Sequence, residues 1–134
     1  MVNNFFIDLD NAREGERIVR EELSKLLPHY KFENVSNNRA YWHKGDIKAT
    51  DEETGDSVFI EVKQDSRIAD TGNVLCEDKV YYYGRGLKDG NMYSSYEIYS
   101  IVSTSARRIW FIDFSVLQSI YKKSGTYKQI NHFD

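Results

Sequence analysis

Residues 44–65 read KGDIKATDEETGDSVFIEVKQD, and this stretch decides the fold of the chain. Two runs that alternate apolar and polar residues, 45–50 and 57–64, flank the turn DEETGD at 51–56. Alternation of this kind predicts strands, and a short polar turn between two such runs predicts a β-hairpin.

The predicted hairpin carries charged side chains on one of its two faces. Successive side chains of a strand point to opposite faces, so Phe59, Glu61 and Lys63 share one face of the second strand. A hairpin symmetric about its turn sets Asp46 opposite Glu61 and Lys48 opposite Phe59, with facing Cβ atoms about 5 Å apart. A register shift of one residue would separate the two acids.

Two facing carboxylates repel each other unless a positive charge lies between them. Asp46 and Glu61 therefore suit a divalent cation, and their hard oxygen ligands favour Mg²⁺ or Mn²⁺ over zinc. The ammonium of Lys63 could orient a water or hold a phosphate oxygen beside that cation. Together these groups indicate metal-assisted hydrolysis of a phosphodiester. The plainer alternative is an exposed cross-strand ion pair, which contributes little.

The stretch DNAREGERIVREELSKLLPH predicts a helix that begins at Asp10 and ends before Pro28. Glu16 falls on the apolar stripe of this helix, where a glutamate is rarely buried without a partner. Glu16 is therefore either an additional metal ligand or a glutamate bound to Arg39, His43 or a backbone amide.

The rest of the chain adds strands and a second helix. We expect extended structure at 30–36, 72–84, 94–104 and 108–114, a loop at 84–91 and a helix at 115–125. This order of elements predicts one α/β or α+β domain over residues 1–134, built around a mixed sheet.

An acid at position 46 followed by EVK at 61–63 resembles the signature of the PD-(D/E)XK nucleases. Across residues 12–65 the chain is most similar to archaeal-type Holliday junction resolvases and their restriction-endonuclease-like relatives. Gly45 stands where the signature has proline. The resemblance implies an α/β restriction-endonuclease-like core, with a central mixed β-sheet flanked by helices in the order αβββαβ. It also implies Mg²⁺-dependent cleavage of DNA, either duplex or branched.

The resemblance also implies a role for each candidate residue. The implied metal ligands are Asp46, Glu61, the backbone carbonyl of Val62, and Glu16, the last directly or through water. Lys63 corresponds to the catalytic lysine. Gln64 follows it at a position where relatives often carry a polar residue, so it could contact substrate or water.

The tyrosine-rich segment 81–99 has two interpretations. Its rings could stack on bases near Arg85 and Lys88, as in proteins that bind single strands. Tyrosines at strand spacing are more often packed against neighbouring strands or subunits, and we favour that interpretation for Tyr96 and Tyr99.

Composition limits the class of protein and its surroundings. The net charge is −3 and 40% of the residues are hydrophobic, so the overall charge does not indicate a nucleic-acid binder. Cys76 is the single cysteine, which fits a reducing, cytoplasmic setting. Neither a signal peptide nor an apolar run of about 20 residues is present, so we expect no membrane partner. The size is typical of phage or mobile-element proteins.

The interpretation of the whole chain as a nuclease has two rivals. One is a catalytically inactive nucleic-acid-binding domain of the same fold, which would bind DNA without Mg²⁺-dependent turnover. The other is a protein-interaction module, which would not bind DNA even at low salt. A nuclease that cuts both strands of a duplex or junction would suit a homodimer.

Overall fold

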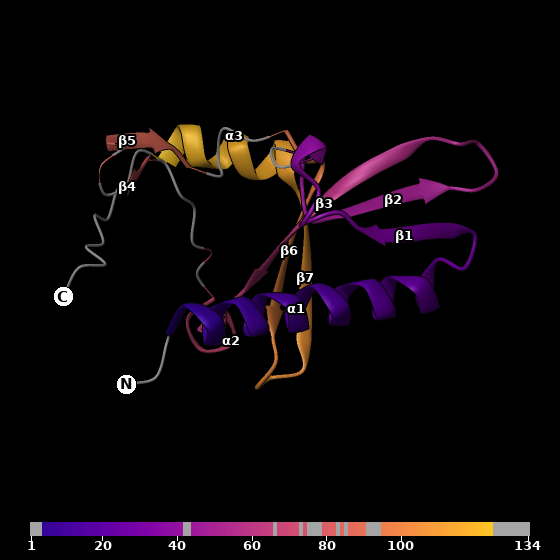
Figure 1. The fold of residues 1–134 in the computed structure, drawn as a ribbon, viewed down its shortest axis with the longest axis horizontal. Coiled ribbons are helices and arrows are strands. Elements are labelled where there is room, and N and C mark those ends of the chain that lie inside the picture. Colours follow the sequence, from indigo (N-terminus) through magenta and orange to yellow (C-terminus); the bar gives the residue numbers. More distant parts are fainter. Residues whose placement is uncertain are drawn as a thin grey trace.

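The computed structural model describes residues 4–41, 44–65, 67–72, 74, 79–82, 84, 86–90 and 95–124. Figure 1 shows the order of the elements along the chain. They are α1 (Asn4–Leu26), β1 (Tyr30–Asn34), the 3₁₀ turn η1 (Arg39–Tyr41), β2 (Ile47–Asp51), β3 (Ser57–Gln64), α2 (Ile68–Thr71), β4 (Lys79–Tyr82), β5 (Gly86–Asp89), β6 (Ile98–Ser103), β7 (Arg108–Asp113) and α3 (Phe114–Ser124).

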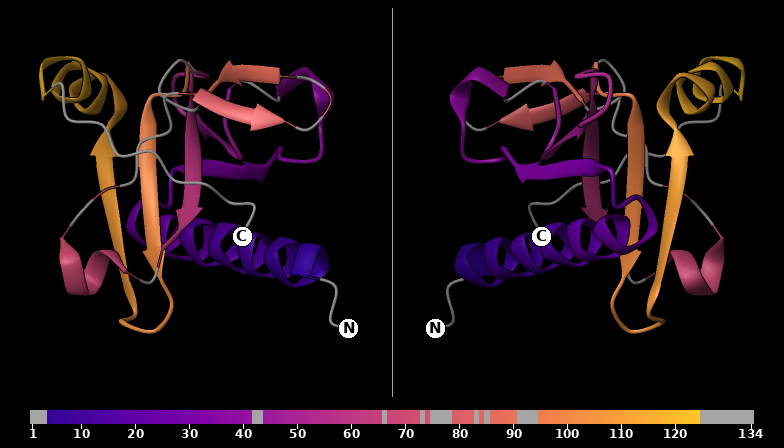
Figure 2. Two further views of the ribbon diagram at one scale, coloured as in Figure 1. Left: turned by 90° about the vertical axis from the view of Figure 1, so that its left-hand side faces the viewer. Right: turned by 90° about the vertical axis from the view of Figure 1, so that its right-hand side faces the viewer.

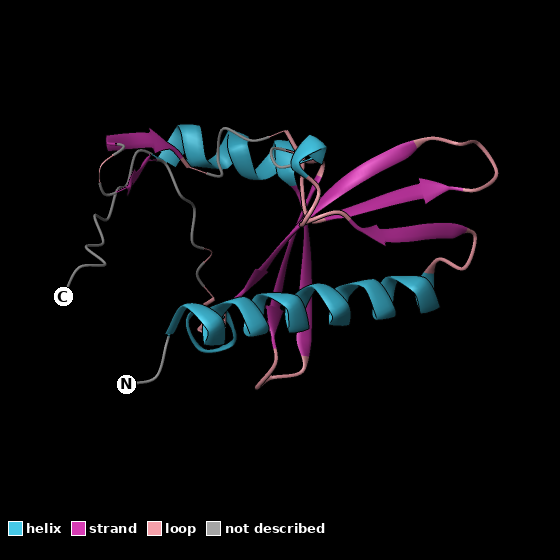
Figure 3. Ribbon diagram, in the orientation of Figure 1, coloured by secondary structure: helices cyan, strands magenta, loops and turns pink. Residues whose placement is uncertain are grey.

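Five strands form one mixed sheet in the order β1-β2-β3-β6-β7. The pairing of β3 with β6 is parallel and the other pairings are antiparallel. A second sheet contains only the antiparallel hairpin β4–β5. Figure 3 shows the helices on both sides of the main strands, so the chain has the predicted α/β class with a mixed sheet.

One face of the main sheet is covered by α1 (Figure 2). Val19 and Leu23 on the inner side of the helix pack against Ile47, Ile60 and Val102 of three neighbouring strands. These residues are all at least nine-tenths buried. Removing this much apolar surface from water is the main force that holds the helix on the sheet.

The opposite face of the sheet is covered by α2 and α3, which lie on the other side of the strands in Figure 2. Ile68 of α2 and Phe114 of α3 join Tyr96 and Tyr99 in a second buried cluster. The rings of Tyr96 and Phe114 lie 4.3 Å apart between centroids. Tyr96 and Tyr99 are 4% and 2% exposed, so they pack within the fold, and more deeply than tyrosines that pack at a half-buried strand surface or a subunit interface.

The register of the β2–β3 hairpin is the one predicted from its turn. Lys48 pairs with Phe59 and Ile47 pairs with Ile60. The alternation of faces follows from this register, since Ile60 packs beneath α1 while Phe59 packs against the opposite cluster.

Three predicted boundaries are wrong. The helix α1 begins at Asn4, so Asp10 lies inside it rather than at its start. Residues Gly86–Asp89 form β5 and not a loop, because their backbone pairs with β4. The strand predicted at 94–104 begins later in the structure, since β6 starts at Ile98 and residues 95–97 precede it.

The short helix α2 has no clear signal in the sequence. It is a single turn of four residues, and Ile68 is its one buried side chain. Its end is marked by Gly72 with φ +69°, in the left-handed region that glycine favours. Within the described residues, no helix combines the length and the apolar character that crossing a membrane requires.

Candidate active site

Asp46 is fixed at the entrance to β2 by bonds to both neighbouring strands. Its backbone N–H donates to the carbonyl of Ile60 at 2.9 Å, and its own carbonyl accepts from the N–H of Val35 at 2.8 Å. Its Oδ2 accepts from the backbone N–H of Val62 at 2.9 Å. The side chain is therefore held across β3 and not in solvent.

The residue before Asp46 explains how the chain reaches this position. Gly45 has φ +137°, and a Cβ atom there would lie 2.9 Å from the carbonyl oxygen of Ile60. Proline, which the PD-(D/E)XK signature has at this position, requires a φ near −65°. This backbone conformation therefore suits glycine and excludes proline.

Glu61 lies on β3 against the carboxyl of Asp46. Burial, and then the hydrogen bond and charge of Asp46, raise the pKa of Glu61 to about 9. A protonated Glu61 can donate its proton to Asp46, whereas two ionised carboxylates at this distance would repel. The backbone of Glu61 is also fixed, because Ser100 Oγ on β6 donates to its carbonyl at 2.8 Å.

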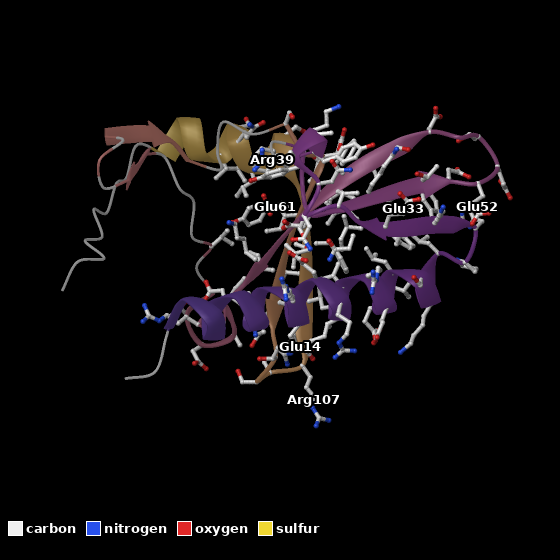
Figure 4. The ribbon with its side chains drawn as sticks, in the orientation of Figure 1. Glu14, Glu33, Arg39, Glu52, Glu61 and Arg107 are labelled. Carbon is white, nitrogen blue, oxygen red and sulfur yellow. The ribbon has the colours of Figure 1, made fainter. Side chains whose placement is uncertain are left out.

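Lys63 lies on the same face of β3 as Glu61, as the alternation of the strand predicts. Its positive charge lowers the pKa of Glu61, although burial and Asp46 outweigh it. Figure 4 shows Glu61 in the middle of the molecule, between α1 and η1 in that view. The structure thus brings Asp46, Glu61 and Lys63 together at one place.

Glu16 reaches toward this place from α1. It is 7% exposed. Its Oε2 accepts from Asn34 Nδ2 at 2.7 Å and from Ser36 Oγ at 3.1 Å. Burial raises the pKa of Glu16, the nearby charge of Asp46 raises it further, and the bonds from Asn34 and Ser36 lower it. Glu16 therefore lies within electrostatic range of Asp46.

The partners of Glu16 were not identified from the sequence. The N–H of Ser36 donates to Asn34 Oδ1 at 3.0 Å, an Asx-type turn that follows β1. An asparagine followed two residues later by a serine at a strand end is the signal that indicates such a turn. His43, one of the partners considered for Glu16, lies outside the described residues.

Gln64 is not brought together with the acids. Its side chain lies beside Gly15 of α1, on the face that also carries Val62, and its Nε2 donates to Thr104 Oγ1 at 3.3 Å. Its Oε1 is buried and has no hydrogen-bond partner among the described residues. Gln64 therefore lies on the opposite face of β3 from Glu61 and Lys63.

The donor set at the site fits a hard divalent cation in number and type. Mg²⁺ is usually bound by one or two carboxylates and keeps several waters or substrate oxygens. Asp46 and Glu61 supply two carboxylates, and the carbonyl of Val62 is a further oxygen on the same strand. Within the described ranges, no group of three or more His, Cys, Asp or Glu side chains is placed to hold a metal ion.

A groove of about 650 Å³ lies elsewhere on the described surface, between α1 and β7. Its lining includes Ile18 and Leu26 of the helix and Ile109 and Phe111 of the strand. Neither Asp46 nor Glu61 lines it, so the groove is separate from the acids.

Comparison of the chain with models of protein families, with curated proteins and with solved structures finds no match.

Proposed function

We propose that the chain is a metal-dependent endodeoxyribonuclease of the PD-(D/E)XK type. The observation that carries this proposal is the half-buried contact between the carboxyls of Asp46 and Glu61, with the charge of Lys63 beside them. Two carboxyls in such a contact repel when both are ionised unless a cation lies between them, and perturbed acids in this kind of constellation are typical of catalytic sites.

The fold supports the proposal. In this proposal α1, β1, β2, β3, the single-turn α2 and β6 correspond to the order αβββαβ, and the β4–β5 hairpin is an insertion before β6. In this arrangement the two acids lie where β2 and β3 meet, and α1 supplies Glu16.

The residues of the chain have distinct roles in the proposed reaction. Asp46 and Glu61, with the Val62 carbonyl, would hold Mg²⁺ or Mn²⁺, which neutralises charge on the phosphate and makes a bound water more acidic. Glu61 must lose its proton before it can act as a ligand. The Val62 N–H keeps Asp46 directed at the site. Glu16, whose carboxylate accepts hydrogen bonds from Asn34 and Ser36, would reach the cation through a water bound to it.

Lys63 would contribute its ammonium to the phosphate that is cleaved. A lysine is a compact charge with three donors, and it can contact a phosphate oxygen or orient the attacking water. Gln64 has no place in this reaction, because its side chain lies on the α1 face of the strand.

A cleavage assay tests the proposed function. Linear duplex, single-stranded, flap and four-way-junction DNA would be incubated with Mg²⁺, Mn²⁺ or EDTA. Asp46→Asn, Glu61→Gln and Lys63→Met should each abolish cutting, whereas Glu52→Gln, an exposed acid on the hairpin turn, should not. If folded Asp46 and Glu61 variants cut as fast as the wild type, the chain is not this kind of nuclease.

An inactive DNA-binding domain of the same fold is the second candidate. It is favoured by the lack of a third acidic, histidine or cysteine ligand at the acid pair among the described residues. This candidate predicts salt-sensitive DNA binding with no cleavage under any metal.

We also propose that the protein acts as a cytoplasmic homodimer, since one copy per strand would allow a duplex or junction to be cut on both strands. Light scattering coupled to gel filtration measures the mass in solution, with and without DNA.

A further inference from the structure

The face of the hairpin that carries Glu61 also carries two aromatic rings. Tyr41, at the end of η1, and Phe59, on β3, lie 5.5 Å apart between ring centroids and are tilted by 34°. Both residues are half-buried and keep some exposed surface, although Phe59 also packs against the buried cluster around Tyr99. Phe59 precedes Glu61 by two residues, so its ring is one pleat of the strand, about 7 Å, from the acid pair.

Two lysines lie over these rings. The Nζ of Lys44 is 5.5 Å from the centroid of Phe59, and the Nζ of Lys48 is 5.6 Å from the centroid of Tyr41. Lys48 is also the cross-strand partner of Phe59. We call these four residues the Tyr41–Phe59 platform. A cation over a ring is a weak contact at an exposed site, so the ammonium can move to a phosphate when one is present.

The acids that border the platform have partners of their own. Glu33 forms an ion pair with Lys31 at 2.9 Å. The carboxylate of Glu97 accepts from the backbone N–H of Phe59. Glu33 is also the cross-strand partner of Lys48, whose charge contributes to lowering the pKa of Glu33 together with that of Lys31. Lys44 and Lys48 place two positive charges at this edge of the site within an acidic chain.

We propose that the Tyr41–Phe59 platform binds an unpaired nucleotide of the DNA strand that enters the site, and this inference rests on the proposed nuclease function. The face of a base can lie on an aromatic ring only when the base is not stacked within a duplex. A ring with a lysine beside it matches the two parts of a nucleotide, the base and its phosphate.

This placement names a class of substrate. The platform begins one pleat from Glu61, so the unpaired nucleotide is a close neighbour of the phosphate that would be cut. DNA with unpaired nucleotides at the cleavage point, as in single strands, flaps and open junctions, is then bound more tightly than a continuous duplex.

Binding measured without cleavage tests the inference. Fluorescence anisotropy of a labelled oligothymidylate, in EDTA so that no cutting occurs, would compare the wild type with Tyr41→Leu and with Lys44→Gln/Lys48→Gln. Each variant should bind about tenfold more weakly, because stacking of one base and each phosphate contact contribute on this scale. Tyr30→Leu, a half-buried tyrosine on the α1 side of the sheet, and Lys25→Gln, an exposed lysine of α1, are the matched controls and should bind as the wild type does.

Two results would overturn the inference. One is single-strand affinity in the platform variants equal to that of the wild type, and the other is wild-type affinity for a continuous duplex equal to that for the single strand. Parallel Mg²⁺ cleavage assays keep the two proposals apart. Loss of single-strand binding in the platform variants of a protein that never cuts DNA supports the platform and removes the nuclease. If the protein cuts DNA and its platform variants bind single strands as the wild type does, the nuclease is supported and the platform is ruled out.

Discussion

The carboxyl of Glu61 lies in contact with the carboxyl of Asp46, and the two residues reach this position from facing strands of one hairpin. The contact is half-buried, and the charge of Lys63 does not outweigh the effects that raise the pKa of Glu61. It follows that the two acids are stable together only when they share a proton or a cation.

The first prediction concerns the stability of the metal-free protein at different pH values. The pKa of Glu61 is raised from an ordinary 4.5 to about 9, so between these values the folded protein retains a proton that the unfolded chain releases. The free energy of unfolding should therefore fall as the pH rises through this range. Glu61→Gln should remove most of this slope and stabilise the protein by roughly 2–4 kcal/mol at pH 8.

Urea unfolding in EDTA at several pH values measures this effect. Glu52→Gln changes an exposed acid of the hairpin turn and should leave the slope unchanged. A wild-type stability that rises between pH 5 and pH 8, with the same rise in Glu61→Gln, would show that Glu61 is already ionised in the folded state.

The second prediction concerns binding of the cation. Because Glu61 must lose its proton to act as a ligand, Mg²⁺ or Mn²⁺ should raise the melting temperature more at pH 8 than at pH 6. Calorimetric titration in two buffers of different ionisation enthalpy measures the proton released on binding. Asp46→Asn should show neither the thermal shift nor the proton release, and a shift of wild-type size in this variant would argue against the site.

The third prediction concerns the residues that hold Glu16. Ser36→Ala removes a hydrogen bond to the Glu16 carboxylate. Residues that orient a metal-site carboxylate by a hydrogen bond typically contribute about 10- to 100-fold to metal affinity or activity. We expect Mn²⁺ affinity and cleavage rate to fall by about tenfold. Ser24→Ala on the exposed side of α1 is the control, since its hydroxyl only donates to the Arg20 carbonyl. Equal loss in both variants would mean that the effect is a general one on the fold.

The fourth prediction concerns Gly45. Alanine there would be strained by φ +137° and would bring a Cβ atom to 2.9 Å from the Ile60 carbonyl oxygen. Gly45→Ala should lower the free energy of unfolding by roughly 2–4 kcal/mol and displace Asp46. Gly55 also has a positive φ, +81°, but there is open space around it. Gly55→Ala should therefore lower the free energy of unfolding by only about 1 kcal/mol. Urea unfolding measures the free energy of unfolding of both variants. Equal losses in Gly45→Ala and Gly55→Ala would contradict the steric argument.

The parts of the fold governed by local alternation could be predicted from the sequence. The turn at 51–56 fixed the register of Lys48 and Phe59, because a one-residue slip would have moved apolar side chains out of the core. The facing positions of Asp46 and Glu61 followed from the same register.

Features that depend on distant parts of the chain could not be predicted in this way. The segment Gly86–Asp89 is extended because β4 pairs with it, and its own glycine and charged residues favour a loop. Asn34 and Ser36 were missed because their role comes from the packing of α1 over β1. Strand alternation alone predicts that Gln64 lies on the same face of β3 as Val62. The family resemblance instead suggested that Gln64 contacts substrate or water beside Lys63.

The parallel pairing of β3 with β6 has a consequence for how the protein folds. Asp46 and Glu61 belong to a local hairpin, and hairpins close in about 1–10 μs. Glu61 and its β6 neighbour Tyr99 are far apart in the chain, and contacts of this kind form slowly. We therefore expect the two acids to meet while water still surrounds them, and to lose that hydration in the later step in which β6 docks.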